Sequence, residues 1–167
     1  MLYRTVMESP VGPLTLVASD KGLRAVLWEC DAPTRVRLGE VLDDIDDPNG
    51  VLAAAEEQLD EYFAGSRCEF DLPLDPDGTD FQHNAWDALC TIPFGETVSY
   101  GEQARRMGDV RKARAVGAAN GRNPLSIIVP CHRVVGADGS LTGFAAGLET
   151  KAWLLDHERK VWVTQQA

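Results

Sequence analysis

The sequence predicts an α/β fold of the α+β type, in which a small antiparallel sheet with one helix precedes a mostly helical domain. Three observations lead to this prediction. Apolar and polar residues alternate near the start of the chain, as they do in strands, whereas helical spacing dominates after residue 80. Between the two patterns, segment 71–80 (DLPLDPDGTD) is rich in proline, glycine and aspartate. We therefore place two domains at 1–78 and 79–167.

Three strands are predicted at the start of the first domain. Segments 2–7 and 14–18 alternate apolar and polar residues, and the prolines and glycine between them favour a turn, so the two form an antiparallel pair. A second turn at residues 20–22 leads into segment 23–28, which completes a small sheet. Residues 43–50 form a polar, acidic loop.

One helix follows this loop and covers a face of the sheet. Over residues 51–63 the apolar side chains recur at helical spacing, at Leu52, Ala55, Leu59, Tyr62 and Phe63. Gly65 stands where such a helix would end, because glycine adopts the left-handed conformation of a C-terminal cap without strain.

The second domain opens with three short helices. The first begins at residue 79 or 80 and ends before Pro93, and its apolar face consists of Phe81, Ala85, Trp86 and Leu89. Ser99 and Glu102 form a capping box for the second helix, 100–107, and a basic third helix follows after a tight turn. This order is typical of a helix-turn-helix unit. Two core helices with a solvated basic face are the alternative.

The third helix, 111–120, has a surface suited to close contact with a groove of DNA. Its side chains are mostly small, at Ala113, Ala115, Gly117, Ala118 and Ala119, so the helix can approach a surface closely. Arg114 lies between two of these alanines, and a lone cation on a narrow surface is typical of proteins that enter the minor groove. Further cations are candidates for phosphate contacts: Arg105, Arg106, Arg111, Lys112 and Arg122.

Charge is distributed unevenly between the two halves of the chain. The net charge of −10, taken alone, argues against a polyanionic partner. Residues 1–80 carry 18 Asp and Glu against 6 Lys and Arg, a net −12, whereas residues 81–167 carry 8 against 10, a net +2. Contact with nucleic acid therefore belongs to the second half, and we expect the acidic first half to face away from a duplex.

Composition indicates a globular, cytoplasmic protein. With 44% apolar residues in 167, the chain can bury a core, and no apolar run approaches the ~20 residues of a membrane span. Residues 1–19 lack the basic and apolar blocks of a signal peptide. The cysteines form no CxxC pair and no metal-ligand spacing, so we expect no metal and no cofactor. Cys30, Cys68 and Cys90 have apolar neighbours and are interpreted as core residues.

The segment IIVPCHRVVG, residues 127–136, carries the strongest indication of chemistry. Its β-branched residues 127–129 predict a short buried strand that Pro130 ends, so Cys131 would follow a rigid platform. A thiol reacts as the thiolate, and the adjacent His132 is a candidate base. Because consecutive side chains of an extended chain point to opposite faces, His132 would act after a sharp turn or through a bridging water.

A late helix, 148–158, offers a partner for the imidazole. Trp153, Leu154 and Leu155 are predicted to face the core, and Glu158 near the end of the helix is a candidate to orient His132. The alternative for Glu158 is an exposed helix carboxylate.

Six segments of the second half stand in the order SYGE, ARAVG, GRNP, PCHRV, LTGFAAG and KAWLLDHE. In this order and spacing, from about residue 81 to 158, they resemble the O6-alkylguanine-DNA alkyltransferase family of the stand-alone bacterial type. The resemblance implies a ribonuclease-like N-terminal domain, which the first 80 residues match loosely, and a winged-helix-like C-terminal domain. It also implies binding to double-stranded DNA through the minor groove, flipping of an O6-alkylguanine, and irreversible alkyl transfer to a cysteine.

The resemblance assigns roles to individual residues. Cys131 would be the alkyl acceptor, His132 the base acting through a water, and Glu158 its partner. Asn123 would join the region of the basic helix to the active-site segment by hydrogen bonds. Tyr100 would donate a proton at guanine N3 and crowd the phosphate beside the lesion.

Further implied roles concern the flipped base. Arg114 would fill the space that the base leaves. The carbonyl of Val134, with that of the cysteine, would accept from the guanine amino group, and the amide of Ala145 would reach O6. Phe144 and Ala146 replace a tyrosine and a glycine common in the family; the first can still stack, and the second adds a methyl group to the pocket wall. We therefore expect methyl transfer rather than efficient handling of bulky groups.

Three other functions compete with alkyl transfer. A DNA-binding protein that senses alkylated bases without removing the alkyl group would carry Trp in place of Cys131. A cysteine hydrolase with a Cys/His/Glu set would leave the basic helix and Arg114 without a use. A winged-helix regulator would treat the cysteine as structural. Alkyl transfer by a monomer uses all of these features.

Overall fold

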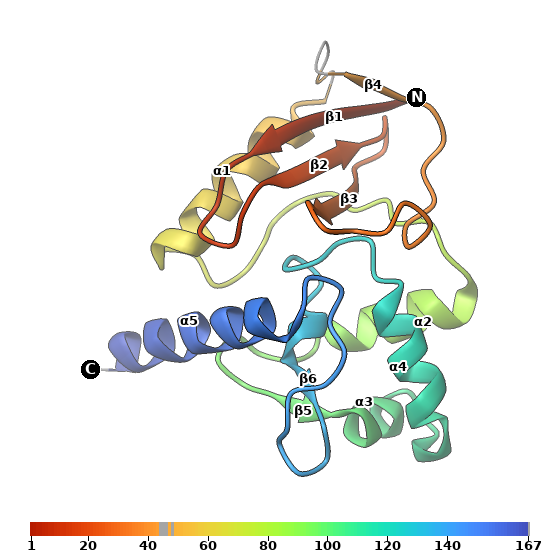
Figure 1. Ribbon diagram of the computed structural model, residues 1–167, viewed down its shortest axis with the longest axis vertical. Coiled ribbons are helices and arrows are strands. Elements are labelled where there is room, and N and C mark those ends of the chain that lie inside the picture. The colour runs from red at the N-terminus through yellow and green to blue at the C-terminus, as the bar shows by residue number, and fades with distance from the viewer. Residues whose placement is uncertain (44–46, 48, 167) are drawn as a thin grey trace. The chain divides into compact units, whose positions relative to one another are not determined.

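The computed structural model describes residues 1–43, 47 and 49–166, and the chain forms two compact units, Met1–Asp77 and Gly78–Ala167 (Figure 1). The first unit contains a four-stranded sheet and a helix, and helices dominate the second. The α+β class is therefore confirmed. Of the acidic loop expected over residues 43–50, residues 44–46 and 48 lie outside the described part.

The sheet of the first unit has the strand order β3-β2-β1-β4. Strands β1 (Leu2–Met7), β2 (Leu14–Ala18) and β3 (Leu23–Trp28) are antiparallel neighbours with the predicted bounds. Strand β4 (Val41–Asp43) was not predicted; it pairs parallel to β1 and is too short to show a period of two.

Helix α1 (Val51–Ala64) packs on this sheet through its apolar stripe, as Figure 1 shows. Its fully buried residues include Ala55, Leu59 and Tyr62. Gly65 ends the helix at φ 84°, and its N–H caps the carbonyls of Glu61 and Tyr62. The predicted helix and its glycine cap are both confirmed.

Four short helical segments open the second unit: α2 (Asp80–Leu89), α3 (Tyr100–Arg106), the 3₁₀ turn η1 (Val110–Lys112) and α4 (Ala113–Gly121). The helix-turn-helix order is confirmed, although the predicted third helix starts as a 3₁₀ turn. Ser99 accepts a hydrogen bond from the amide of Glu102, at 3.0 Å.

The second hydrogen bond of the predicted capping box, from the backbone N–H of Ser99 to the Glu102 side chain, is wrong. The Glu102 carboxylate instead binds the guanidinium groups of Arg105 and Arg106.

A buried pair of amide side chains fixes α3 against α4. Gln103 and Asn120 donate to each other's oxygens at 2.9 and 2.7 Å, and Gln103 also donates to the carbonyl of Ala85 in α2, at 3.1 Å. Gln103 is fully buried. This reciprocal pair satisfies polar groups that would otherwise be costly inside the protein, and it sets the position of the basic helix.

The chain then turns back toward the core before Cys131. Residues 127–129 form a turn rather than the predicted strand: the amide of Val129 donates to the carbonyl of Leu125 at 2.8 Å, and Ile127 has φ 74°. Their burial comes from packing, not from strand pairing. The prediction failed because a β-branched apolar run indicates burial as well as strand, and hydrogen bonds within residues 123–129 form a turn instead.

A two-stranded parallel sheet and a long helix complete the second unit. Strand β5 (Val98–Ser99) pairs with β6 (Val134–Val135), which follows the 3₁₀ turn η2 (Cys131–Arg133). Helix α5 (Leu148–Gln166) is eight residues longer than predicted.

The core face of α5 also differs from the prediction. Lys151, Leu154 and Glu158 are buried, whereas Trp153 and Leu155 are half-exposed.

The assignment of three cysteines to the core is wrong. Cys30 and Cys90 are exposed and Cys68 is half-buried, since Cys30 lies in the turn after β3 and Cys90 caps the end of α2. Apolar neighbours in sequence do not place a residue that sits at the end of an element. Within the described ranges, no helix is long and apolar enough to cross a membrane.

The Gln103–Asn120 pair generates a stability prediction. Gln103→Ala removes a buried side chain and leaves the amide group of Asn120 without its buried partner, so the free energy of unfolding should fall by about 2–4 kcal/mol. Urea unfolding at neutral pH measures this loss. Gln166→Ala, at an exposed position of α5, is the matched control. Equal unfolding midpoints for both variants would contradict the role of the pair.

Candidate active site and nucleic-acid interface

Cys131 begins the 3₁₀ turn η2 directly after Pro130. Its amide donates to the carbonyl of Val129 at 2.9 Å, and the amide of Arg133 donates to the carbonyl of Pro130 at 3.0 Å. Because successive side chains of a 3₁₀ turn are about 120° apart, Cys131 and His132 do not point to opposite faces. Of the two arrangements expected from the sequence, a sharp turn after Pro130 is the one that the structure has. Cys131 is partly exposed, whereas His132 is completely buried.

His132 is bound to Glu158 of α5. Its Nε2 lies 2.6 Å from Oε2 of Glu158, and the two side chains are 0% and 1% exposed. The alternative of an exposed Glu158 is wrong. A carboxylate can only accept, so Nε2 carries a proton, which leaves Nδ1 of a neutral ring as an acceptor. This Nδ1 is buried and has no hydrogen-bond partner among the described residues.

Arg133 shares the same carboxylate. Its Nε and Nη2 lie 2.8 and 3.2 Å from the two oxygens of Glu158, and its Nη1 donates to the carbonyl of Ile92 at 2.7 Å. The guanidinium also stacks over Phe94, 5.6 Å from the ring centre. Sequence reasoning missed Arg133. The signal was an arginine inside an apolar run, since an arginine is seldom buried unless it is paired.

The pKa of Glu158 is well below its usual range. Burial alone raises it, but interactions with His132 and Arg133 outweigh that effect. Glu158 is therefore ionised at neutral pH, and it can hold the imidazole in one tautomer and one orientation.

Lys151 is a second functional candidate that the sequence did not reveal. It is fully buried, and its Nζ donates to the carbonyls of Val134 and Thr142 at 2.6 and 2.8 Å. Burial lowers the pKa of Lys151, while the charge of the nearby Cys131 raises it. The signal in the sequence was its spacing: Lys151 stands seven residues before Glu158, so both lie on one face of the late helix.

Asn123 connects the end of α4 to the turn before the cysteine. Its Nδ2 donates to the carbonyl of Val129 at 2.8 Å, and its Oδ1 accepts from the amide of Leu125 at 3.0 Å. The side chain is 1% exposed. Asn123 thus links the basic helix with the backbone that presents Cys131.

The residues expected to contact the flipped base lie on segments next to the β5–β6 pair. Tyr100 follows β5 directly, and its hydroxyl accepts from Oγ1 of Thr142 at 3.1 Å. Phe144, Ala145 and Ala146 are half-exposed residues of the loop between β6 and α5. The carbonyl of Val134, expected to accept from guanine, already accepts from Lys151, and a carbonyl has a second lone pair for another donor.

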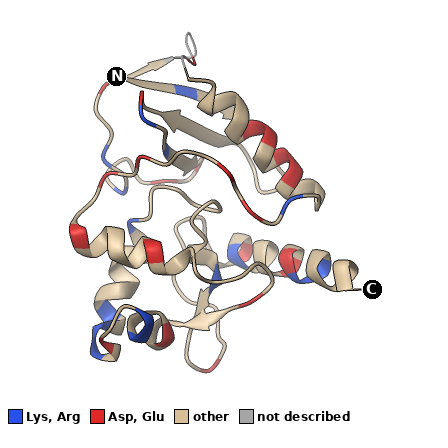
Figure 2. Cartoon of the chain, turned by 180° about the vertical axis from the view of Figure 1, so that it is seen from behind, with Lys and Arg blue, Asp and Glu red and all other residues tan. Residues whose placement is uncertain are grey.

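The basic helix exposes its expected contact residues. Arg114 and Ala115 are exposed and Ala113 is half-buried, and the cations Arg111, Lys112 and Arg122 are exposed. Figure 2 shows cations gathered on α3 and α4, whereas α1 carries Asp and Glu. Arg111 pairs with Asp109 at 3.0 Å, and Lys112 lies over the ring of Phe81 at 5.7 Å.

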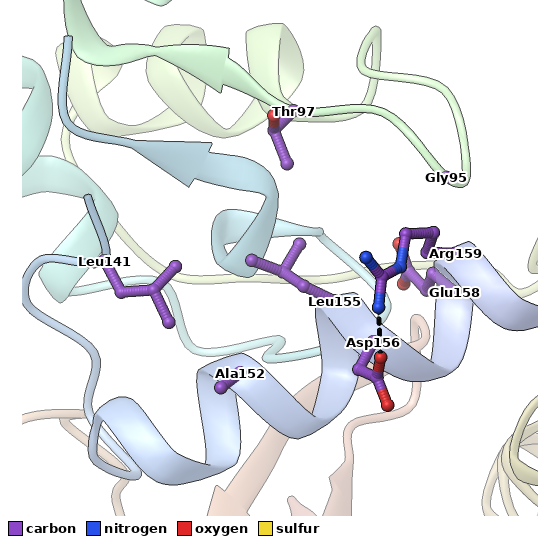
Figure 3. Close-up of a pocket in the computed structure, with 8 residues that line it drawn as sticks. All are labelled: Gly95, Thr97, Leu141, Ala152, Leu155, Asp156, Glu158 and Arg159. Atoms are coloured by element: carbon purple, nitrogen blue, oxygen red, sulfur yellow. Dashed lines mark hydrogen bonds and ion pairs between the residues drawn. The ribbon is translucent and has the colours of Figure 1, made fainter. Parts of the chain in front are cut away.

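A pocket of about 370 Å³ lies beside α5 (Figure 3). It is lined by Gly95, Thr97, Leu141, Ala152, Leu155, Asp156, Glu158 and Arg159. Two of these residues are paired, since Arg159 donates a hydrogen bond to Asp156 at 2.6 Å. Its lining includes neither Cys131 nor Tyr100, so this pocket is distinct from the site expected for the base. In the part of the chain that the structure describes, no cluster of His, Cys, Asp and Glu could hold a metal ion.

The lowered pKa of Glu158 generates a pH prediction. As pH falls, the unfolded chain takes up this proton first, so the stabilisation is complete above the ordinary value of 4.5 and is lost below it. Wild-type stability should therefore fall more steeply than that of Glu158→Gln between about pH 5 and pH 3. At neutral pH the variant should be less stable by ~3 kcal/mol.

Urea unfolding at several pH values measures both quantities. Glu149→Gln, at an exposed position of the same helix, controls for the loss of one carboxylate. Parallel pH curves for the wild type and Glu158→Gln would contradict the prediction.

Comparison with known proteins matches both units. The family model of the 6-O-methylguanine DNA methyltransferase ribonuclease-like domain matches residues 2–76, and that of the DNA binding domain matches residues 80–160. A methylated-DNA--protein-cysteine methyltransferase of Methanosarcina acetivorans is 45% identical over 94% of this chain and 98% of its own length. One of Mycobacterium bovis is 49% identical over 94% of this chain and 92% of its own length.

Solved structures agree with these matches. The crystal structure of Mycobacterium tuberculosis OGT in complex with DNA has a TM-score of 0.85 and 45% identity, covering 95% of this chain and 94% of its own. An O6-methylguanine DNA methyltransferase from Methanococcus jannaschii has a TM-score of 0.64 and 28% identity, with 93% of both chains covered. On this evidence the chain belongs to the 6-O-methylguanine DNA methyltransferase family.

Proposed function

We propose that this protein repairs DNA directly, by transferring the alkyl group of an O6-alkylguanine, chiefly methyl, to Sγ of Cys131. The observation that carries the proposal is a partly exposed cysteine beside a buried His132–Glu158 pair, in a chain of this family. The thiolate attacks the alkyl carbon, the S–C bond forms as the C–O6 bond breaks, and the electron pair leaves with guanine. No step regenerates the thiol, so one molecule repairs one lesion.

Activation of the thiol begins at His132. Nδ1 is the ring atom available to accept a proton, since Nε2 is engaged with Glu158. A water between Sγ and Nδ1 would pass the thiol proton to the imidazole, and the ionised Glu158 would stabilise the imidazolium that results.

Departure of guanine requires stabilisation of the charge on the leaving base. Tyr100 would donate its hydroxyl proton at N3, and the amide of Ala145 would donate at O6. The carbonyls of Cys131 and Val134 would accept from the amino group of guanine. The half-exposed Phe144 would stack on the base, and Ala146 would narrow the pocket wall.

Binding to duplex DNA would use the basic helix α4 in the minor groove. Ala113 and Ala115 would allow close approach, and Arg114 would occupy the space of the flipped base. Arg111, Lys112 and Arg122 would contact phosphates, and Asn123 would transmit the position of the helix to the turn before Cys131.

The protein would work as a monomer in the cytoplasm. A domain boundary at residues 78 and 79 would separate the acidic first domain from the part that binds DNA.

Stoichiometry tests the proposed function. With excess duplex containing O6-methylguanine, the wild-type protein should remove one lesion per molecule and then stop, because Cys131 is consumed. Chromatography of the released bases counts the remaining lesions. Cys131→Ala should bind the same duplex and remove none. Continued turnover would contradict transfer to the protein, and lesion binding without loss of lesions by the wild type would favour a sensor.

Arg114 has a separate test. Arg114→Ala should slow repair of duplex DNA by about 10-fold or more, because base flipping costs a few kcal/mol and the side chain offsets part of it. Reaction with free O6-methylguanine, which needs no flipping, should keep the wild-type rate. Arg159→Ala, at an exposed arginine of α5, is the matched control. Equal losses on both substrates would reject a role in base flipping.

A further inference from the structure

Thr142 is the residue that contacts the phenol of Tyr100. Its Oγ1 donates to Oη of Tyr100 at 3.1 Å, although the two residues are 42 positions apart. Thr142 lies in the loop between β6 and α5, whereas Tyr100 begins α3. This hydrogen bond therefore ties the loop to the helix-turn-helix unit.

The position of Thr142 is itself fixed by a buried charge. Nζ of Lys151 donates to the carbonyl of Thr142 at 2.8 Å and to that of Val134 at 2.6 Å. Lys151 is fully buried in α5, so its two hydrogen bonds are worth more than bonds between exposed groups. An exposed loop threonine is thereby held at a defined distance from the strand that follows Cys131.

The ring of Tyr100 is held on its other side as well. A Cβ placed on Gly117 of α4 would lie 3.6 Å from the edge atoms of the tyrosine ring, so the ring packs along this glycine. The strand pairing Ser99↔Val135 fixes the backbone just before Tyr100. Backbone pairing, ring packing and the hydroxyl bond together restrict the orientation of the phenol.

The direction of the Thr142 hydrogen bond bears on the reaction. When Thr142 donates, Oη of Tyr100 accepts, and the phenol proton stays available for another acceptor. A donor at Oη also stabilises negative charge that develops there as the phenol gives up its proton. Both effects favour proton donation by Tyr100 rather than by a water.

We infer that Thr142, held by Lys151, is a positioning residue for the reaction: it orients the Tyr100 hydroxyl toward N3 of the leaving guanine and stabilises the oxygen during proton donation. This inference rests on the proposed alkyl transfer. Thr142 acts through Tyr100 and touches neither the alkyl group nor the thiol, so its effect depends on the phenol hydroxyl.

A double-mutant cycle tests the inference. Single-turnover methyl transfer from duplex DNA is followed at increasing protein concentration, which separates the limiting rate constant from the half-saturating concentration. Thr142→Val, which keeps the shape and removes the hydroxyl, should lower the limiting rate constant about 10-fold with little change in half-saturation. Thr142→Ser should rescue the rate to within about 2-fold, since it keeps the donor.

The cycle is completed by Tyr100→Phe and the double variant. Removal of the Thr142 hydroxyl should add no further loss in the Tyr100→Phe background, because the two groups act as one unit. Thr164→Val, which removes a hydroxyl from an exposed position of α5, is the matched control and should react as the wild type does.

Three results would overturn the inference, and the first two are a wild-type rate for Thr142→Val and a double variant slowed by the product of the two single effects. A change confined to half-saturation would also overturn it, because it would assign Thr142 to DNA binding. A wild-type protein that transfers no methyl group would contradict the proposed function itself, which separates the two failures.

Discussion

The second unit depends on one carboxylate that two neighbouring side chains share. Glu158 binds Nε2 of His132 through one oxygen and reaches the guanidinium of Arg133 through both. A buried carboxylate without partners would destabilise the fold. Loss of either the His132 imidazole or the Arg133 guanidinium would leave the charge of Glu158 less compensated in the interior. The three groups therefore form one unit, which attaches α5 to the turn that presents Cys131.

Helix α5 contributes a second buried side chain to the site. Lys151 lies on the face of α5 that carries Glu158, and it binds the carbonyls of Val134 and Thr142. One negative and one positive buried side chain on a single helix thus hold two side chains of η2 and the backbone that follows it. A reactive thiol needs this rigidity, because alkyl transfer requires sulfur, carbon and oxygen in line.

Sequence patterns predicted the parts of the molecule whose cause is local. The strands over 2–28 and the helix capped by Gly65 follow from period and turn chemistry, and they have the expected bounds. Strand β4 was missed because three residues show no period. The turn at 127–129 was mistaken for a strand, since the side chain of Asn123 donates to the carbonyl of Val129 and accepts from the amide of Leu125.

Most contacts within the site could not be predicted from the sequence, because they join residues that are far apart along the chain. Glu158 was suggested by its place in the late helix and by the family resemblance. Arg133 and Lys151, in contrast, bind acceptors 25 and 17 residues away, and the contact of Thr142 with Tyr100 spans 42. No local pattern specifies such distances. A charged residue in an apolar stripe was the one available signal, and it indicates burial with a partner without identifying that partner.

We propose that Cys131 is the reactive thiol, activated by the buried His132–Glu158 pair. Peptide mass analysis after reaction with duplex DNA containing O6-methylguanine tests this most directly, because the thiols of Cys30, Cys68 and Cys90 serve as internal controls. We expect one methyl group, carried by the peptide that contains Cys131 and by no other. A methyl group on one of the other three cysteines, or an unmodified Cys131 after the lesion has been removed, would contradict it.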